Sequence, residues 1–209
     1  NYISLSLTSE IPAGWGLKSS SAVSNAISLA CHKLMNDDVY DRSVLNTAVS
    51  SSLWAKVSLT GAFDDACACY YGGLVITDNS YKKLIKRVTI NNDLYAVIFL
   101  PNGVARGDIS RLSLHKELFY HAFKLALKGD YWKAMNLNGM LINSVLYENY
   151  KPLLNALENN CLGVSYSGNG PSIAAVVHKD NIDQARNSME KFQGKIIISQ
   201  VNNSKSFVT

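Results

Sequence analysis

The chain has 209 residues, of which 47% are apolar and 17% are charged, and its formal net charge is +4. This composition is typical of a globular protein with a hydrophobic core, and it excludes the disordered and fibrous classes. The longest apolar runs, at 95–100 and 173–177, fall far short of the roughly 20 residues that cross a bilayer. We therefore expect no membrane span and no membrane partner.

Lysine and arginine are scattered along the chain except for a small cluster at 82–87, which no repeating aromatic pattern accompanies. Such a cluster is typical of a solvated turn and not of a nucleic-acid surface. We therefore expect no nucleic-acid partner. The positive net charge favours anionic ligands slightly.

The cysteines form no C-x-x-C pair, and none of the four histidines stands at metal-ligand spacing from Cys67 and Cys69. Buried free thiols are the favoured interpretation, and a metal site is the alternative. Because a chain of this length does not need disulfides, a reducing cytoplasm fits best. The four cysteines are Cys31, Cys67, Cys69 and Cys161.

The chain begins with alternating apolar and polar residues at 2–8, which predict a strand whose Ile3, Leu5 and Leu7 face a core. Because no initiator Met precedes this strand, we expect a missing N-terminal segment. After a glycine-rich turn, we expect a helix from Ser20 closed at 36–38, a helix at 43–57, a loop at 60–65 and a strand at 74–77. The apolar positions of the two helices are Val23, Ala26, Ile27, Ala30 and Leu34, then Val44, Leu45, Ala48 and Val49.

The second half begins with a predicted buried strand at 94–100, stopped by a Pro-Asn-Gly turn. Two helices are expected next, joined where Gly129 ends the first and Asp130 caps the second. The two helices are predicted at 110–127 and 130–146, followed by strands at 162–166 and 173–178, a helix at 181–192 and a strand at 195–201. We place a domain division after residue 85, which gives domains 1–85 and 86–209.

The segment 11–22 combines a strand exit, a glycine turn and a hydroxyl-rich helix start. The first N–H groups of a helix have no intrahelical partner and the dipole is positive there, so this start is an anion site. Gly14 and Gly16 let the backbone approach a phosphate, and serines add hydrogen bonds or ligate Mg²⁺. The candidate phosphate-binding residues are Pro12, Ala13, Gly14, Trp15, Gly16, Leu17, Lys18, Ser19, Ser20, Ser21 and Ala22.

This spacing matches neither of the two commonest nucleotide loops. A Walker A loop requires a glycine five residues before Gly16, and a dinucleotide fingerprint requires one where Ser19 stands. A capped helix after a tight turn is the alternative to an anion site.

Two further segments contain candidate site residues. Adjacent carboxylates, Asp64 and Asp65, follow Gly61 in a stretch almost free of other charges, and an Asp beside a substrate hydroxyl accepts its proton in phosphoryl transfer. The alternative is that Asp64 caps a helical turn and Asp65 is solvated. The second segment, between two strands, suits a tight turn near a ligand or a plain hairpin loop, and its residues are Ser167, Gly168, Asn169 and Gly170.

In this order and separation, the three segments resemble the GHMP kinase superfamily, named for galacto-, homoserine, mevalonate and phosphomevalonate kinases. Its central motif P-x-x-x-G-L-x-S-S-[SA] is matched by Pro12, Gly16, Leu17, Ser19, Ser20 and Ser21. Its S-G-x-G-P loop is matched by Ser167, Gly168, Gly170 and Pro171. Asp64 looks like the catalytic Asp that precedes a helix in the superfamily. The match spans nearly the whole chain.

Within the superfamily, the segments 16–22 and 60–66 look most like the archaeal type of shikimate kinase. Lys18 distinguishes this type from most other members of the superfamily, which have a small residue at that position. The segment 107–111 is also similar to that type, and Arg111 is expected to bind a carboxylate bidentately unless it is only the polar start of a helix.

The resemblance implies an α+β, GHMP kinase-like two-domain fold, with an incomplete helix-backed sheet domain followed by a ferredoxin-like domain. It implies a kinase that uses ATP and Mg²⁺, with the metal near Ser20 and catalysis by Asp64 and Lys18. The expected substrate-binding residues are Asp64, Asp65, Arg111, Ser167, Gly168, Asn169 and Gly170. Shikimate is the expected acceptor, and the alternatives are a homoserine or mevalonate-type kinase and a non-catalytic ligand-binding module. The superfamily's first motif is absent, so the adenine contacts are not assigned.

Overall fold

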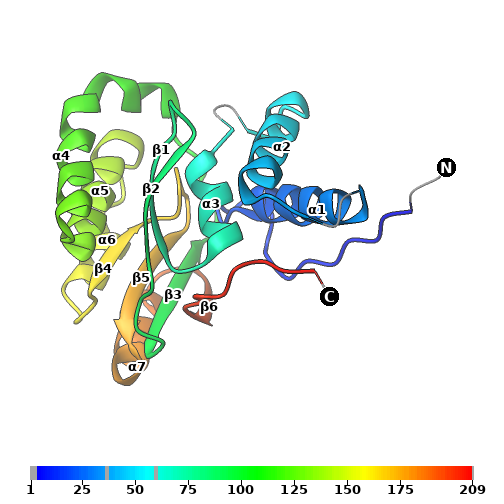
Figure 1. Ribbon diagram of the computed structural model, residues 1–209. Helices are drawn as coiled ribbons and strands as arrows, with labels where there is room; N and C mark the ends of the chain where they lie inside the picture. The colour runs from blue at the N-terminus through cyan, green and yellow to red at the C-terminus, as the bar shows by residue number, and fades with distance from the viewer. Residues whose placement is uncertain (1–3, 36–37, 59–60, 209) are drawn as a thin grey trace. The chain divides into compact units, whose positions relative to one another are not determined.

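A computed structural model describes residues 4–35, 38–58 and 61–208 of the chain (Figure 1). By packing, the chain divides into two units, and each is described by itself below. Unit 1 comprises residues 1–89 together with 202–209, and unit 2 comprises 90–201. The domain division into 1–85 and 86–209 stays a prediction.

The described part of unit 1 contains three helices and a two-stranded antiparallel sheet. The two predicted helices and the predicted strand at 74–77 are confirmed, while the helix at Phe63 begins inside the predicted loop. The strand at 83–88 was predicted as a solvated turn, and that prediction is wrong because these residues pair with the preceding strand. The elements are α1 (Ser19–Met35), α2 (Asp41–Trp54), α3 (Phe63–Tyr71), β1 (Leu74–Asp78) and β2 (Lys83–Val88).

The predicted strand at 2–8 is not found where the structure describes this segment. Residues 4–8 have no regular secondary structure, and the side chains of Leu5 and Leu7 are exposed and do not face a core. A strand requires a neighbour that takes up its backbone hydrogen bonds, and no described strand pairs with these residues. Tyr2 and Ile3 lie outside the described residues, as do Asn36, Asp37 and Thr60 of the other predicted boundaries.

The buried face of α1 is polar, which differs from the predicted apolar face. Ala26, Ala30 and Leu34 are exposed, whereas the buried positions are Ser21, Asn25, Ser28 and Leu29. The Ser28 hydroxyl donates to the Val44 carbonyl at 2.8 Å, and the Asn25 amide donates to the Ala66 carbonyl at 2.8 Å. Small polar side chains therefore join α1 to α2 and α3 through hydrogen bonds, while Oδ1 of Asn25 is buried with no hydrogen-bond partner among the described residues.

The apolar face predicted for α2 is confirmed, and it forms the core of unit 1 with α3. The buried members of this core are Leu29, Val44, Leu45, Val49, Phe63, Ala66, Cys67 and Tyr70. The core of unit 1 is therefore built mainly by α2 and α3, on which the candidate acidic residues lie.

Unit 2 contains a four-stranded antiparallel sheet in the order β4-β5-β3-β6. Along the chain the strands and helices alternate as β-α-β-β-α-β, so the predicted ferredoxin-like arrangement is confirmed. The strands are β3 (Leu94–Pro101), β4 (Gly163–Tyr166), β5 (Ile173–His178) and β6 (Gly194–Gln200). The helical elements are η1 (Ile109–His115), α4 (Lys116–Lys128), α5 (Tyr131–Leu146), α6 (Lys151–Leu157), η2 (Lys179–Asn181) and α7 (Ile182–Glu190).

The helix predicted at 110–127 is two elements, because η1 is a 3₁₀ helix and the α-helix begins only at Lys116. The short helix α6 was not predicted. Gly129 adopts φ +95° and ends α4 as predicted, but the Asp130 side chain makes no capping hydrogen bond.

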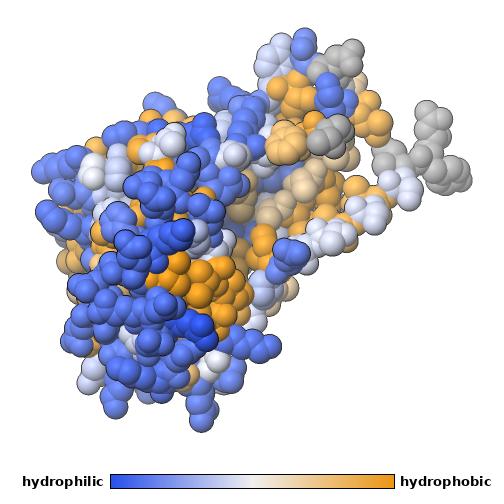
Figure 2. Space-filling model, turned by 90° about the horizontal axis from the view of Figure 1, so that it is seen from below, coloured by the Kyte–Doolittle hydropathy of each residue, from blue (hydrophilic) through white to orange (hydrophobic). Residues whose placement is uncertain are grey.

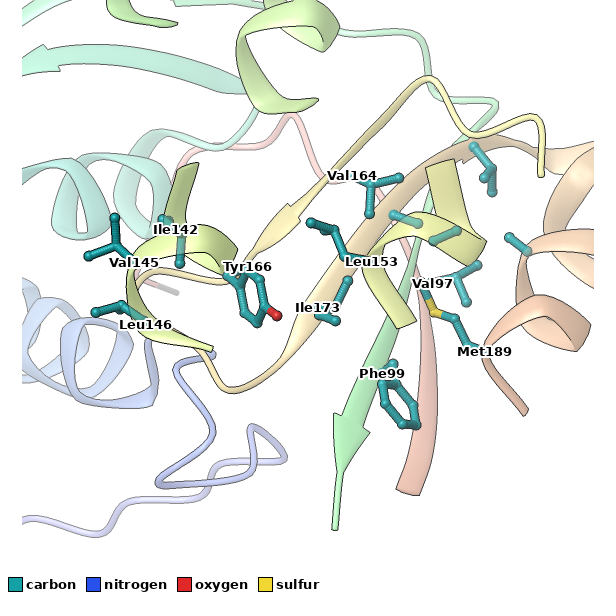
Figure 3. Close-up of a cluster of buried hydrophobic side chains, with 14 residues drawn as sticks. Val97, Phe99, Ile142, Val145, Leu146, Leu153, Val164, Tyr166, Ile173 and Met189 are labelled. Atoms are coloured by element: carbon teal, nitrogen blue, oxygen red, sulfur yellow. The ribbon is translucent and has the colours of Figure 1, made fainter. Parts of the chain in front are cut away.

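The core of unit 2 lies where α5, α6 and α7 pack on the sheet. Figure 3 shows Tyr166 and Ile173 of the sheet beside Ile142 of α5, and Met189 of α7 beside Val97 of β3. These side chains are almost fully buried. The same core therefore holds the end of α5 against the end of β4, where the glycine-rich loop begins.

Most of the surface seen in Figure 2 is hydrophilic, and hydrophobic residues (orange) appear on it in patches. In the parts of the chain that the structure describes, no helix combines the length and the apolar character needed to cross a membrane.

Candidate active site

The glycine-rich turn of unit 1 has three left-handed residues before α1. Their φ angles are +84° at Gly14, +77° at Gly16 and +66° at Lys18. The first helical hydrogen bond runs from the Ala22 N–H to the Lys18 carbonyl at 3.0 Å, so the N–H groups of the first turn have no acceptor within the helix. A Cβ placed on Gly14 would meet no atom within 4 Å, which leaves open space at the turn. The turn therefore fits an anion such as a phosphate.

The serines at the start of α1 differ in exposure. Ser20 is exposed, whereas Ser21 is buried against the helices of unit 1. Among these two hydroxyls, that of Ser20 is available to a ligand or to a metal ion held by phosphate oxygens.

The side chain of Lys18 points to Asp65, and its Nζ lies 2.7 Å from the Asp65 carboxylate. Both side chains are mostly buried, with exposed fractions of 26% and 19%. Burial raises the pKa of Asp65, the charge of Lys18 lowers this pKa, and the neighbouring Asp64 raises it; the net direction is upward. Asp65 is therefore a carboxylate at the edge of the anion site that takes up a proton more readily than a solvated Asp.

Asp64 lies in a different environment from Asp65 although both belong to the first turn of α3. It is exposed, and the Asn79 amide donates to its carboxylate at 2.8 Å. The Asp64 N–H in turn donates to the side-chain oxygen Oδ1 of Asn79 at 3.0 Å. The N-cap position of α3 is Ala62, so the alternative that Asp64 itself caps the helix is wrong. Asn79, the residue that follows β1, supplies the hydrogen bond that caps α3.

The start of α3 is fixed by backbone shape and by α1. Gly61 and Ala62 are both left-handed, and a Cβ on Gly61 would lie 2.6 Å from Cγ1 of Val49. The Asn25 side chain of α1 holds the Ala66 carbonyl of α3. Together these contacts place Asp65 beside Lys18.

Asn79 and Asn25 were not predicted from the sequence as part of the site. Asn79 follows a strand within the polar run Asp78-Asn79-Ser80, which signals a turn but not the residue that it caps. Asn25 occupies a helical position facing the core, where an amide is rare unless it is hydrogen-bonded.

The second candidate loop lies in unit 2 between β4 and β5. Its N–H groups close it internally, since Gly170 donates to the Ser167 carbonyl at 3.0 Å and Ser167 to the Ser172 carbonyl at 2.8 Å. Gly168 and Gly170 have φ of +59° and +78°. The Tyr147 hydroxyl donates to the Asn169 carbonyl at 2.6 Å. The loop is thus a tight turn that is also held by Tyr147, the residue that follows α5.

Arg111 lies in η1 of unit 2 and is exposed. Asp108 precedes it, and hydrogen bonds from Ser110, assisted by the Arg111 charge, lower the pKa of the Asp108 carboxyl. Arg111 and the 167–170 loop therefore share unit 2, while Lys18, Asp64 and Asp65 belong to unit 1.

All four cysteines are free, and Cys67 is buried while the other three are partly exposed. Burial raises the pKa of the Cys161 thiol to about 11 and, with the Asp65 charge, that of Cys69 to about 11, so these thiols are protonated at neutral pH. Among the described residues no group of three or more His, Cys, Asp or Glu side chains gathers as metal ligands.

Comparison with known proteins identifies the family of the chain. Residues 1–73 match the family model of the GHMP kinases N terminal domain, and residues 132–195 match that of the GHMP kinases C terminal domain. The chain belongs to the GHMP kinase family. The predicted superfamily and fold are therefore confirmed, and the protein is an ATP-dependent kinase.

Two curated relatives of this GHMP kinase are named shikimate kinase. The one from Methanocella arvoryzae is 38% identical over 206 residues, which are 96% of this chain and 70% of the relative. The one from Methanosarcina mazei is 40% identical over 201 residues, which are 94% of this chain and 68% of the relative.

A solved structure, the homoserine kinase of Cytophaga hutchinsonii, matches this GHMP kinase with a TM-score of 0.65 at 23% identity. The match covers 94% of this chain and 69% of the other. At this identity the likeness concerns the fold.

Proposed function

We propose that this GHMP kinase is a shikimate kinase. It transfers the γ-phosphoryl group of ATP to the 3-hydroxyl of shikimate and releases shikimate 3-phosphate and ADP. Identity of 38% and 40% to relatives of that name, over nearly the whole chain, carries the proposal. The Lys18–Asp65 pair at the open glycine turn supplies the carboxylate and the positive charge that phosphoryl transfer requires.

The glycine turn and the first turn of α1 hold the phosphates of ATP. Phosphoryl transfer depends mainly on positioning and on neutralising charge, and free helical N–H groups supply both. The open space at Gly14 admits a phosphate, and the exposed Ser20 hydroxyl is the protein ligand for Mg²⁺. When bound, Mg²⁺ neutralises charge on the phosphate oxygens.

The acidic pair at the start of α3 supplies the base that accepts the proton of the acceptor hydroxyl. The resemblance to the superfamily favours Asp64, but the geometry favours Asp65, because the Asp65 carboxylate contacts Lys18 of the phosphate turn. Its raised pKa suits a general base. Lys18 then has two roles: it holds the Asp65 carboxylate and adds positive charge next to the transferred phosphoryl group.

The remaining candidate residues bind the acceptor in this proposal. They are Asp64, Arg111, Ser167, Gly168, Asn169 and Gly170. The free cysteines agree with a location in the reducing cytoplasm.

The test is an ADP-release assay of the full-length protein with Mg-ATP and a panel of acceptors that contains shikimate, homoserine, mevalonate and galactose. We expect turnover with shikimate well above that with the other three. Turnover with homoserine or mevalonate alone identifies a different kinase of the same family. ATP binding without turnover of any acceptor identifies a non-catalytic module.

A further inference from the structure

The side-chain amide of Asn79 is held in one orientation by two donors. Its Oδ1 accepts from the Asp64 N–H at 3.0 Å and from the Thr77 hydroxyl at 3.0 Å. An amide oxygen accepts and an amide nitrogen only donates, so two donors at this position fix the NH₂ group at the other one. The amide therefore has a defined donor direction.

This NH₂ group points to the Asp64 carboxylate, and Nδ2 of Asn79 donates to Oδ1 of Asp64 at 2.8 Å. One residue of α3 thus both donates to and accepts from the same amide. The second carboxylate oxygen, Oδ2, accepts no hydrogen bond and forms no ion pair within the part of the chain that the structure describes. Because Asp64 is exposed, Oδ2 is open to a ligand.

The turn that carries Asn79 is itself fixed. The Asp78 carboxylate accepts from the Ser80 N–H at 3.0 Å and from the Tyr81 N–H at 3.2 Å, and the Lys82 N–H donates to the Asn79 carbonyl at 3.4 Å. The strand before this turn, β1, packs against α3. Asn79 is therefore presented to α3 by a hydrogen-bonded turn.

The two carboxylates at the start of α3 are held by partners of different charge. Lys18 is a cation that contacts Asp65 at 2.7 Å, whereas Asn79 is a neutral donor to Asp64. A neutral donor orients a carboxylate and leaves its charge in place. An oriented carboxylate loses less freedom when it accepts a hydrogen bond from a ligand, so this arrangement suits the binding of a hydroxyl.

We propose that Asn79 is a positioning residue for the acceptor: by holding Oδ1 of Asp64, it directs Oδ2 to a hydroxyl of the acceptor. This inference rests on the proposed function, which assigns Asp64 to acceptor binding. It adds to that site a residue of the β1–β2 turn.

Asn79→Asp in the full-length protein separates this role from the capping of α3. Aspartate keeps an oxygen for the Asp64 N–H and the Thr77 hydroxyl and is a favourable residue at helix starts, but it has no donor for the Asp64 carboxylate. We expect KM for shikimate to rise about 10-fold, the effect of losing a hydrogen bond to a charged group. Both kcat and KM for ATP are expected to stay nearly unchanged.

Two further variants complete the comparison. Asn79→Ala removes the cap together with the donor, so the same rise in KM is expected with a Tm lower by about 2–4 °C. Ser80→Ala, at the exposed neighbouring position, keeps the backbone bond to Asp78 and is the control with unchanged KM.

A double mutant tests whether Asn79 acts through Asp64. Asp64→Ala removes the carboxylate that Asn79 holds, so Asn79→Asp is expected to change KM for shikimate less than about 2-fold in that background. A further 10-fold rise there would overturn the proposal. A wild-type KM in Asn79→Asp would show that Asn79 only caps the helix, and a fall in kcat at unchanged KM would overturn the role in acceptor binding.

The proposed function fails in a different way. Turnover of another acceptor of the panel, without turnover of shikimate, refutes shikimate kinase activity, and the same variants measured with that acceptor then decide the role of Asn79. A wild-type protein that phosphorylates no acceptor overturns both proposals.

Discussion

Asp64 and Asp65 are adjacent in sequence, but their carboxylates lie in different local environments. Asp64 is exposed and held by Asn79, whereas Asp65 is mostly buried and paired with Lys18. Burial disfavours the charged form of Asp65, and one lysine charge partly offsets this cost. The two side chains therefore differ in exposure and in the groups that they contact.

The first prediction separates these carboxylates. If Asp65 is the base, Asp65→Asn lowers kcat about 10²- to 10⁴-fold, because amides do not accept the proton. Asp64→Asn is expected to have a much smaller effect on kcat, since the amide can keep one hydrogen bond to Asn79. Steady-state kinetics with shikimate and ATP measure both. Near-normal turnover of Asp65→Asn together with an inactive Asp64→Asn would reverse the assignment.

The second prediction concerns the pH dependence of turnover. The base acts as a carboxylate, so turnover falls when Asp65 is protonated, and its raised pKa places this loss above the ordinary carboxyl value of 3.8. Removing the Lys18 charge removes an interaction that lowers this pKa. Lys18→Met is therefore expected to move the acid limb of the kcat profile to higher pH.

Lys133→Met, which removes an exposed lysine of α5, is the control and is expected to leave that limb in place. An acid limb that stays in place or moves to lower pH in Lys18→Met would contradict the role of the pair. Stability has a linked dependence: because folding raises the Asp65 pKa, its contribution to stability is largest below 3.8 and is lost as the pH rises through the raised value.

At the scale of elements, the packing of α5 on β4 depends on one small residue. Gly139 is buried in the middle of α5, and a Cβ there would lie 2.7 Å from the Val164 carbonyl oxygen and 2.8 Å from Cα of Ser165. These atoms belong to the backbone of β4, so they cannot move as a flexible side chain would. The helix therefore approaches the strand at the distance that a glycine permits.

The third prediction is that Gly139→Ala destabilises the protein although alanine is the better helix former. The gain in helix propensity is about 1 kcal/mol, whereas overpacking against a backbone costs about 1–3 kcal/mol. We expect a net loss of about 1 kcal/mol in the free energy of unfolding, measured by urea denaturation. Met140→Ala, at an exposed position of the same helix, is the control. A more stable Gly139→Ala would show that α5 is free to move away from β4.

At the scale of the whole molecule, the chain returns to unit 1 after completing unit 2. The tail 202–208, drawn in red in Figure 1, belongs to unit 1. The Gly73 N–H donates to the Asn202 carbonyl at 2.7 Å, and the Ser206 N–H donates to the Tyr70 carbonyl at 2.7 Å. Lys205 pairs with Asp41 at 2.5 Å. The C-terminal tail therefore packs on unit 1 and stabilises it, although it is distant in sequence from the rest of that unit.

The fourth prediction is that deletion of residues 202–209 loosens α3 more than the sheet of unit 2. The deletion removes backbone hydrogen bonds to Tyr70 and Gly73 at the end of α3, whereas β3 and β5 keep their ladder. Hydrogen exchange followed by mass spectrometry is expected to be faster at 63–73 and unchanged at 94–101. Lys205→Ala, which removes the ion pair with Asp41 and the contact of Nζ with the Tyr70 ring but leaves the backbone hydrogen bonds of the tail, is expected to cost about 1 kcal/mol. Equal acceleration in both segments would show that the tail stabilises the molecule as a whole.

The sequence alone predicted the family from the order and spacing of its motifs, and the resemblance to that family implied the ferredoxin-like unit. The core face of α2 and the end of α4 at Gly129 follow from local order, because they depend on the spacing of apolar residues and on a turn residue. The tertiary structure decided which partner each polar residue has. Lys18 meets Asp65 across 47 positions of sequence, and Asn79 caps a helix that begins at Phe63. Periodicity does not encode these contacts, since they depend on how α1, α3 and β1 pack. For the same reason the buried polar face of α1 was missed: its serines and Asn25 find their hydrogen bonds only on other elements.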